Sequence, residues 1–509
     1  MAKTTLFDLR KTAKLFGYLG IITGVVLFIM FGVLKWPGLH HDSVLYATPI
    51  INLATGNGWR FDSYAFTFIN RPSDEYSFHG VLYPIIFGLL LKISNYENLL
   101  LWSSIFNAIA FIVYTFLFYR ALTTKFPVWG LLIATIFGAM AGLISQELQG
   151  RPEHLAPLLI AIPLLMREFN ITREYFRYYC YIIAGLLFIL SPLPAAIYGM
   201  GLIFWLSLYH RKKLWKELLL AGIISLGSSG LIITVFCSFS PLTWLNNVFF
   251  AGNSPLLPTD FWRLTTTDIS LTSTYPAYNF FVIIVVLLVV KTLLQRKLFV
   301  ILIIWLLLGF YLMPKVQPYG YTPFFPLLLL MICGKEQNWI TQNEKIKNWI
   351  TYIGTGFTGI YFLVLIRLTI MLIIYWQQGT SFVQAKVNLQ QFSEKLNPSN
   401  ERIGYYWLNR PSFIAFGSVN QPLISVESGV LMENNEDTIL TTYEKKFNKK
   451  IVYIIIPQLG HISNLPETIN NSQFKLVYNG WTNKRAKFMG IKLGGAVPGY
   501  QFALYKRVK

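Results

Sequence analysis

The chain has 509 residues and a formal net charge of +20, from 43 Lys and Arg against 23 Asp and Glu. A basic excess of this size raises nucleic acid as a partner, but 54% of the residues are hydrophobic, only 13% are charged, and the mean hydropathy is +0.49. This composition argues against both a soluble multidomain protein and a nucleic-acid binder, and it indicates a membrane protein.

The N-terminus begins with the basic residues Lys3, Arg10, Lys11 and Lys14, and an apolar run over 15–34 follows them. A run of about 20 apolar residues is long enough to cross a bilayer as a helix. No small-residue cleavage pattern follows in Val33-Leu34-Lys35-Trp36-Pro37. The pattern therefore predicts a retained membrane anchor and not a removed signal peptide.

Further apolar runs bounded by charged, Pro-rich or Gly-rich stretches follow along the chain. They lie at 98–119, 127–145, 154–166, 178–191, 194–209, 218–236, 278–294, 298–313, 320–334 and 351–375. With the first run they predict an all-α polytopic membrane protein of about 11 transmembrane helices. The runs at 154–166, 178–191 and 194–209 are short, and they would suit a locally thin or protein-filled region.

Basic residues are unevenly distributed among the connections between these runs. If the N-terminus is cytoplasmic, the inner connections are strongly basic and the short outer loops are close to neutral. The positive-inside rule then predicts a cytoplasmic N-terminus and an extracytoplasmic C-terminus.

Three segments outside the apolar pattern would lie on the outer side, at 35–97, 237–276 and 376–509. The last contains an amphipathic stretch from Val383 to Leu396 and β-rich runs at 402–406, 451–456, 474–478 and 500–505. We therefore predict a transmembrane domain over 1–375 and a small soluble α/β or α+β domain over 376–509. The tail is also net basic, and contact with anionic lipid headgroups or with an acidic acceptor remains open.

The first outer loop contains the most informative residues. It reads His40-His41-Asp42-Ser43-x-x-Tyr46, then Gly56-x-Gly58-Trp59, then Phe78-His79-Gly80-x-Leu82-Tyr83-Pro84. Asp42 follows the first span, where a carboxylate could face a water-filled cavity. It could equally N-cap a helix that begins at Ser43, and the two roles can coexist.

These motifs, together with the many-span body and the outer tail, resemble the GT-C glycosyltransferases. The nearest group comprises the dolichyl-phosphate-mannose-protein mannosyltransferases and the bacterial lipid A aminoarabinose transferases. The resemblance implies the GT-C fold in a bacterial plasma (inner) membrane. It also implies an inverting transfer of a monosaccharide from a polyprenyl-phosphate donor to an acceptor hydroxyl. The acceptor could be a glycolipid, a polysaccharide or a protein.

The resemblance implies that Asp42 is the catalytic base. A carboxylate in a partly dry pocket has a raised proton affinity, which suits removal of the acceptor proton. Many members of this group have two adjacent acids where this chain has His41-Asp42. That departure leaves His41 either a helper or an interfacial residue.

A lipid-phosphate leaving group needs cations or hydrogen-bond donors, and Arg71 and His79 are candidates. The alternative is a solvated loop arginine and a packed loop histidine. Arg151 and Glu153, in Gln149-Gly150-Arg151-Pro152-Glu153-His154, are candidate donor-site residues. They could instead form an ion pair that fixes the turn.

Lys315, Tyr319 and Tyr321 form a third candidate group before the run at 320–334. The resemblance places a basic residue followed by an aromatic residue and prolines beside the donor, so Lys315 would reach a phosphate oxygen. An ordinary interfacial belt of aromatic and basic residues would explain the same pattern.

The sequence predicts no cofactor and leaves the use of a divalent metal open. His40, His41 and Asp42 are not predicted to form a metal site, because adjacent side chains seldom converge on one ion. Two functions of other classes remain. One is a polytopic transporter or flippase of lipid-linked or small solutes, and the other is a non-catalytic scaffold that presents its tail to a partner. The position of nearly all charges at span ends favours the enzyme over the transporter.

Overall fold

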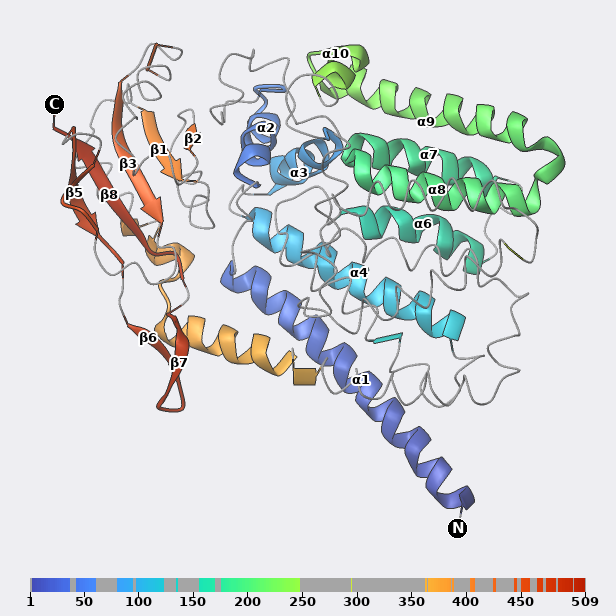
Figure 1. Ribbon diagram of the computed structural model, residues 1–509, viewed down its shortest axis with the longest axis horizontal. Coiled ribbons are helices and arrows are strands. Elements are labelled where there is room, and N and C mark those ends of the chain that lie inside the picture. The colour runs from blue at the N-terminus through green and yellow to red at the C-terminus, as the bar shows by residue number, and fades with distance from the viewer. Residues whose placement is uncertain are drawn as a thin grey trace.

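The computed structural model shows a helical bundle with a strand region beyond one of its ends (Figure 1). The structure describes residues 2–36, 43–60, 80–94, 98–122, 134–135, 155–169, 175–247, 294, 362–363, 365–385, 387–388, 403–407, 424–426, 444–445, 450–457, 465–469, 473–481, 484–497 and 499–508. All structural statements below concern these residues.

Six helices form the described bundle: α1 (Ala2–Leu34), α4 (Leu99–Leu122), α6 (Ala156–Glu168), α7 (Phe176–Leu190), α8 (Pro192–Tyr209) and α9 (Leu214–Phe236). Helix α1 packs on α4, α4 packs on α6, and α7 packs on α6, α8 and α9. The stretches 14–34, 99–120 and 211–236 are long and apolar enough to cross a membrane. These spans support the predicted membrane protein.

Every predicted apolar run within the described residues is helical. The final run, at 351–375, coincides in part with a helix that spans Leu365–Gln378. The runs at 298–313 and 320–334 lie outside the described residues, and those at 127–145 and 278–294 do so almost entirely. The number of about 11 spans therefore stays a prediction.

Helix α9 exposes a continuous apolar face. Leu219, Ile223, Leu226, Leu231 and Val235 are each 61–67% exposed. An exposed apolar stripe of this length is unfavourable in water, but it suits the hydrocarbon of a bilayer. This side of the bundle therefore has the surface of a lipid-facing helix.

Two shorter helices, α2 (Ser43–Thr55) and α3 (Leu82–Ile93), lie at the end of the bundle where α1 and α7 end (Figure 1). We call this end the loop end. Ser43 is the first residue of helix α2 that the structure describes. The helix ends at Thr55, and the next residue, Gly56, has a φ of +82° and lies in a loop closed by a hydrogen bond of 2.9 Å from Asn57 N to Asn52 O. Glycine commonly ends helices in this left-handed conformation, so the first glycine of Gly-x-Gly-Trp has a structural role.

The strand region contains a mixed six-stranded sheet in the order β2-β1-β3-β8-β5-β4. Its strands are β1 (Ile403–Trp407), β2 (Ile424–Val426), β3 (Ile451–Pro457), β4 (Thr468–Ile469), β5 (Phe474–Asn479) and β8 (Phe502–Arg507). Strand β1 is parallel to β2 and β3, whereas the β3/β8, β5/β8 and β4/β5 pairs are antiparallel. The predicted β-rich runs correspond to β1, β3, β5 and β8.

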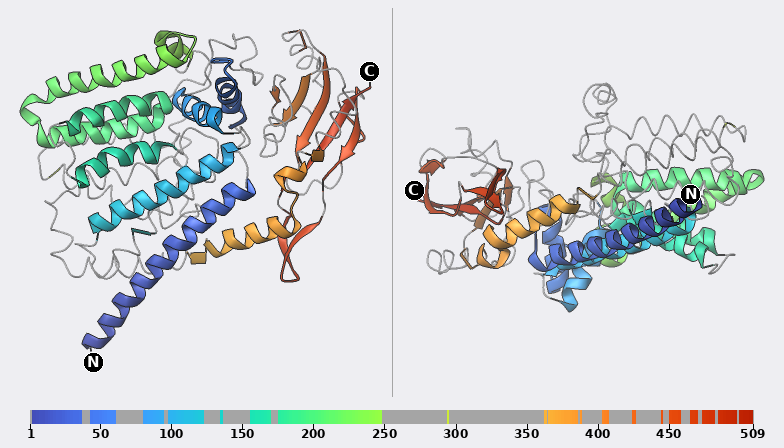
Figure 2. Two further views of the ribbon diagram at one scale, coloured as in Figure 1. Left: turned by 180° about the vertical axis from the view of Figure 1, so that it is seen from behind. Right: turned by 90° about the horizontal axis from the view of Figure 1, so that it is seen from below.

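Strand β8 forms the centre of this sheet. Tyr505 is fully buried, and its hydroxyl donates a hydrogen bond of 2.8 Å to Pro466 O. Burial raises the pKa of Tyr505 to about 12 because the fold disfavours the charged phenolate. A separate hairpin, β6 (Arg485–Phe488) and β7 (Ile491–Ala496), lies beside the helix Leu365–Gln378 (Figures 1 and 2).

Candidate functional site at the loop end of the bundle

The residues predicted to bind or transform a substrate all lie outside the described residues. They are Asp42, Arg71, His79, Arg151, Glu153, Lys315, Tyr319 and Tyr321. The structure does describe the residues that border three of these segments. Ser43 follows Asp42, Gly80 follows His79, and Leu155 follows the segment that contains Arg151 and Glu153.

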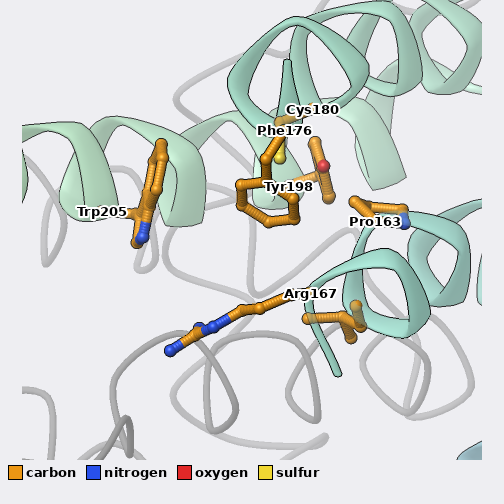
Figure 3. Close-up of a pocket in the computed structure, with 7 residues that line it drawn as sticks. Pro163, Arg167, Phe176, Cys180, Tyr198 and Trp205 are labelled. Carbon is orange, nitrogen blue, oxygen red and sulfur yellow. The ribbon is translucent and has the colours of Figure 1, made fainter. Parts of the chain in front are cut away.

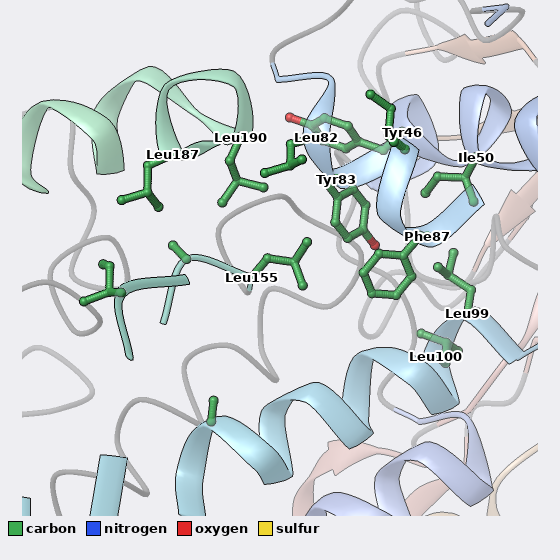
Figure 4. Close-up of a cluster of buried hydrophobic side chains, with 14 of the residues drawn as sticks. Tyr46, Ile50, Leu82, Tyr83, Phe87, Leu99, Leu100, Leu155, Leu187 and Leu190 are labelled. Atoms are coloured by element: carbon green, nitrogen blue, oxygen red, sulfur yellow. The ribbon is translucent and has the colours of Figure 1, made fainter. Parts of the chain in front are cut away.

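The chain segments next to these borders pack into one hydrophobic cluster (Figure 4). Tyr46 of α2, Leu82 of α3, Leu155 before α6 and Leu190 at the end of α7 are all at most 5% exposed. In Figure 4 Leu155 lies between Leu190 and Tyr83. Four segments that are distant in the sequence therefore meet at the loop end.

Gly80 makes the closest of these approaches. A Cβ atom at this position would lie 1.9 Å from Leu190 O and 2.4 Å from Ile189 O. Only a residue without a side chain fits against these carbonyl groups. The glycine of His79-Gly80 therefore ties the start of α3 to the end of α7.

Replacement of Gly80 by alanine should destabilise the protein by about 2 kcal/mol, because backbone atoms would have to move to admit the new methyl group. Thermal unfolding in detergent measures this change. Gly227→Ala is the matched control, since nothing lies within 4 Å of a Cβ atom there. That variant should be neutral or stabilise by up to about 1 kcal/mol. Equal effects of the two substitutions would contradict the close contact.

Tyr46, the tyrosine of Asp42-Ser43-x-x-Tyr46, is a packing residue. The Tyr46 ring lies edge-on to Tyr83 with 5.8 Å between ring centroids, and Tyr83 lies 4.6 Å from Phe87. Tyr46 is 2% exposed and Tyr83 is fully buried. The edge-on contact between Tyr46 and Tyr83 helps to fix the relative position of α2 and α3.

Trp59, from the Gly-x-Gly-Trp motif, joins the first loop to the chain that follows α9. Its ring meets Phe239 edge-on at 5.6 Å, and it is 2% exposed. Ser240 then caps the short helix α10 (Pro241–Leu245), whose Trp244 packs on Phe188 of α7. Through Trp59 the motif thus anchors the first loop to the segment between α9 and α10.

The strand region is attached to the exit of α1. The Tyr500 hydroxyl donates a hydrogen bond to Lys35 O, and the Tyr375 hydroxyl donates one of 3.2 Å to Leu34 O. Trp36 stacks on Tyr375 at 5.3 Å, and the Lys35 ammonium lies 4.5 Å from the Phe382 ring centroid.

We call Lys35, Trp36, Tyr375, Phe382 and Tyr500 the junction. Phe382 meets Tyr500 edge-on at 5.5 Å, and both side chains are buried. The contacts join three parts of the chain that are far apart in the sequence. The junction therefore fixes the last described residue before the segment that contains Asp42.

A small pocket lies at the opposite end of the bundle, between α6, α7 and α8 (Figure 3). Its lining is mostly apolar and consists of Pro163, Leu164, Arg167, Phe176, Cys180, Tyr198 and Trp205. In Figure 3 the Arg167 side chain lies below the rings of Phe176 and Trp205. Ser43, Gly80 and Leu155, the described residues that border three of the predicted site segments, are not among the residues that line this pocket.

The sequence reasoning missed an ion pair near this opposite end. Arg177 Nη1 lies 2.7 Å from Glu217 Oε1, and the Tyr181 hydroxyl donates a hydrogen bond of 2.9 Å to Glu217 Oε2. Glu217 is only 7% exposed. A single acid in the first turn of an apolar helix was the available signal, because such a residue is rarely buried without a partner.

Among the residues that the structure describes, no three His, Cys, Asp or Glu side chains lie together as metal ligands would. Comparison of the sequence with known protein families and with curated proteins found no match.

Proposed function

We propose that this protein is an inverting membrane glycosyltransferase. It moves a monosaccharide from a polyprenyl phosphate to an acceptor hydroxyl on the extracytoplasmic side. The observation that carries the proposal is the meeting of separate segments at the loop end. Tyr46, Leu82 and Leu155, which lie two to four residues from Asp42, His79 and Glu153, all belong to one hydrophobic cluster.

The short covalent distance from the described residues to Asp42, His79 and Glu153 supports a site at the loop end. Consecutive Cα atoms are about 3.8 Å apart, so Asp42 and His79 are each one such step from the described residues Ser43 and Gly80. Glu153 is two steps from Leu155. Polar groups on neighbouring chain segments at the end of a helical bundle are a common basis for an active site.

In the proposed reaction Asp42 takes the proton of the acceptor hydroxyl. The acceptor oxygen forms a bond to the anomeric carbon as the bond from that carbon to the phosphate oxygen breaks. The electron pair leaves with the lipid phosphate, and attack from the opposite face inverts the configuration. General base catalysis of this kind contributes about 100-fold to 10,000-fold to a rate.

Arg71, His79 and Lys315 would stabilise the negative charge that develops on the leaving phosphate. Arg151 and Glu153 would hold the donor sugar, and Tyr319 and Tyr321 would border the sugar or its lipid chain. Cationic and hydrogen-bonding groups are needed because the phosphate oxygen gains charge as its bond to the sugar breaks.

The proposal includes about 11 transmembrane helices of the GT-C type, as the apolar runs predict. It places the N-terminus in the cytoplasm and the 376–509 domain outside a bacterial inner membrane. The described bundle supports the orientation, because Arg120, Arg167, Arg177 and 211–213 all lie at the end opposite the loop end. Basic residues favour the cytoplasmic side.

Incubation of the purified protein with a panel of polyprenyl-phosphate sugars tests the proposal. We expect one donor to be consumed and free polyprenyl phosphate to accumulate when an acceptor extract is present. A parallel assay in liposomes measures movement of the lipid-linked sugars across the bilayer. Movement without cleavage of any donor would contradict the transferase and support the transporter.

A further inference from the structure

The β6–β7 hairpin has an unusual composition. Residues 484–497 include Lys484, Arg485, Lys487 and Lys492 and contain no acidic residue. The side chains of all four are exposed. The hairpin is therefore a compact source of positive charge.

The tip of the hairpin is apolar and points away from the protein. Met489 and Gly490 form a two-residue turn with φ values of 50° and 82°, which is the pattern of a type I′ turn. Met489 is 87% exposed and Ile491 is 68% exposed. Apolar side chains at the end of a basic hairpin are poorly suited to open water.

The register of the two strands places like charges opposite each other. Lys487 pairs directly with Lys492 across the hairpin. Like charges in opposite positions of an antiparallel pair are destabilising, because the side chains lie only about 5 Å apart. An anionic ligand on this face would remove the repulsion.

The hairpin is attached to the end of an apolar helix. Gln378 is the last residue of the helix Leu365–Gln378; its amide donates a hydrogen bond to Lys487 O, and its Oε1 accepts one of 3.1 Å from Lys487 N. Trp376, two residues earlier, is 72% exposed, and tryptophan is typical of the membrane interface. Figures 1 and 2 show the hairpin beside this helix end.

We infer that the β6–β7 hairpin is a membrane anchor that binds anionic phospholipid headgroups. The hairpin lies on the leaflet at which the helix Leu365–Gln378 ends. Met489 and Ile491 enter the region between headgroups and acyl chains, while Arg485, Lys487 and Lys492 contact lipid phosphates. The anchor holds the strand region against the membrane surface and does not depend on the proposed sugar transfer.

Charge and position together favour lipid over other occupants. The two hydrogen bonds to Gln378 hold the hairpin at the level where an apolar helix ends, which is where headgroups begin. Basic side chains around an apolar tip match an anionic interface, in which phosphates surround an apolar interior.

A fluorescent probe at the tip tests this anchor in the full chain. Met489→Cys is labelled with an environment-sensitive dye and reconstituted into nanodiscs of phosphatidylcholine alone or mixed with phosphatidylglycerol. The matched control is Val508→Cys, since Val508 is 55% exposed near the C-terminus. The chain without an added cysteine corrects for labelling of the native cysteines.

We expect the dye at position 489 to show blue-shifted emission and protection from iodide in the anionic discs, with a smaller change in the neutral discs. The dye at position 508 should behave alike in both. Emission at position 489 that matches position 508 in both lipids would overturn the anchor. Protection at position 489 that depends on protein concentration would indicate a second copy as the occupant and also overturn it.

Lys487→Gln and Lys492→Gln, introduced together into the labelled Met489→Cys chain, test whether these two lysines bind the anionic headgroups. The double substitution should abolish the difference in dye emission between anionic and neutral discs. It should not lower the thermal midpoint, because it also removes the like-charge pair. An unchanged difference would overturn the role of these lysines. Met489→Cys with Lys92→Gln is the charge control, since Lys92 is exposed at the end of α3.

Discussion

Asp42→Asn should abolish sugar transfer, with a loss of at least about 100-fold in turnover, while the protein still folds and inserts. Asparagine keeps the size of the side chain and can still cap a helix at Ser43, but it cannot accept the acceptor proton. Turnover is measured with the donor found in the panel, and folding is measured by thermal unfolding in detergent.

Asp74→Asn is the matched control because Asp74 is another carboxylate of the same outer loop. That variant should retain most of the activity. Full activity in the Asp42 variant would remove the catalytic assignment. Full activity in Asp42→Asn, together with a lower thermal midpoint in Asp42→Ala, would indicate that Asp42 is only a helix cap, because alanine removes the cap and asparagine keeps it.

Arg177→Met should lower the free energy of unfolding by about 2 kcal/mol, less than for a fully buried pair because the Arg177 side chain is 32% exposed. The substitution leaves Glu217 buried without its cation, and Tyr181 alone donates to the carboxylate. Removal of one partner of a buried pair is costly because the remaining charge has lost both water and its counterion. Thermal or denaturant unfolding in detergent measures the loss.

A second variant and a surface pair separate this explanation from simple loss of packing. The double variant Arg177→Met and Glu217→Leu should regain most of the stability, because apolar residues can replace a buried pair at little cost. Arg120→Met breaks the pair with Glu168, whose side chains are 57% and 29% exposed, and should cost less than about 1 kcal/mol. A double variant as unstable as the single one would contradict the ion-pair explanation.

The apolar runs located α1, α4, α6, α7, α8 and α9, because a segment that crosses a bilayer must be apolar and must satisfy its own backbone hydrogen bonds, as a helix does. The runs at 98–119 and 218–236 correspond to α4 and α9. The separation of α7 from α8 at Ser191 was also predicted. Strands β1, β3, β5 and β8 were found because they combine β-branched and aromatic residues.

The motifs of the first loop were harder to interpret from sequence. Gly56 ends a helix, Trp59 packs on Phe239, and Tyr46 packs on Tyr83. Residues that look functional because they are distinctive can instead be needed for packing. The strands β2 and β4 were missed because three and two residues are too few to show an alternating pattern. The β6–β7 hairpin was missed because its basic residues and glycines give little strand signal.

By itself the sequence determined that this is a helical membrane protein with a strand-rich tail. Hydrophobicity and its period act locally, so they can be read from consecutive residues. Only the tertiary structure decided which distant segments meet. The contact of Gly80 with Leu190 O, the junction of Tyr500 with Lys35 O, and the register of Lys487 with Lys492 depend on how the chain folds back on itself. The charge of +20 was visible at once, but the structure was needed to place part of it on a hairpin at the end of an apolar helix.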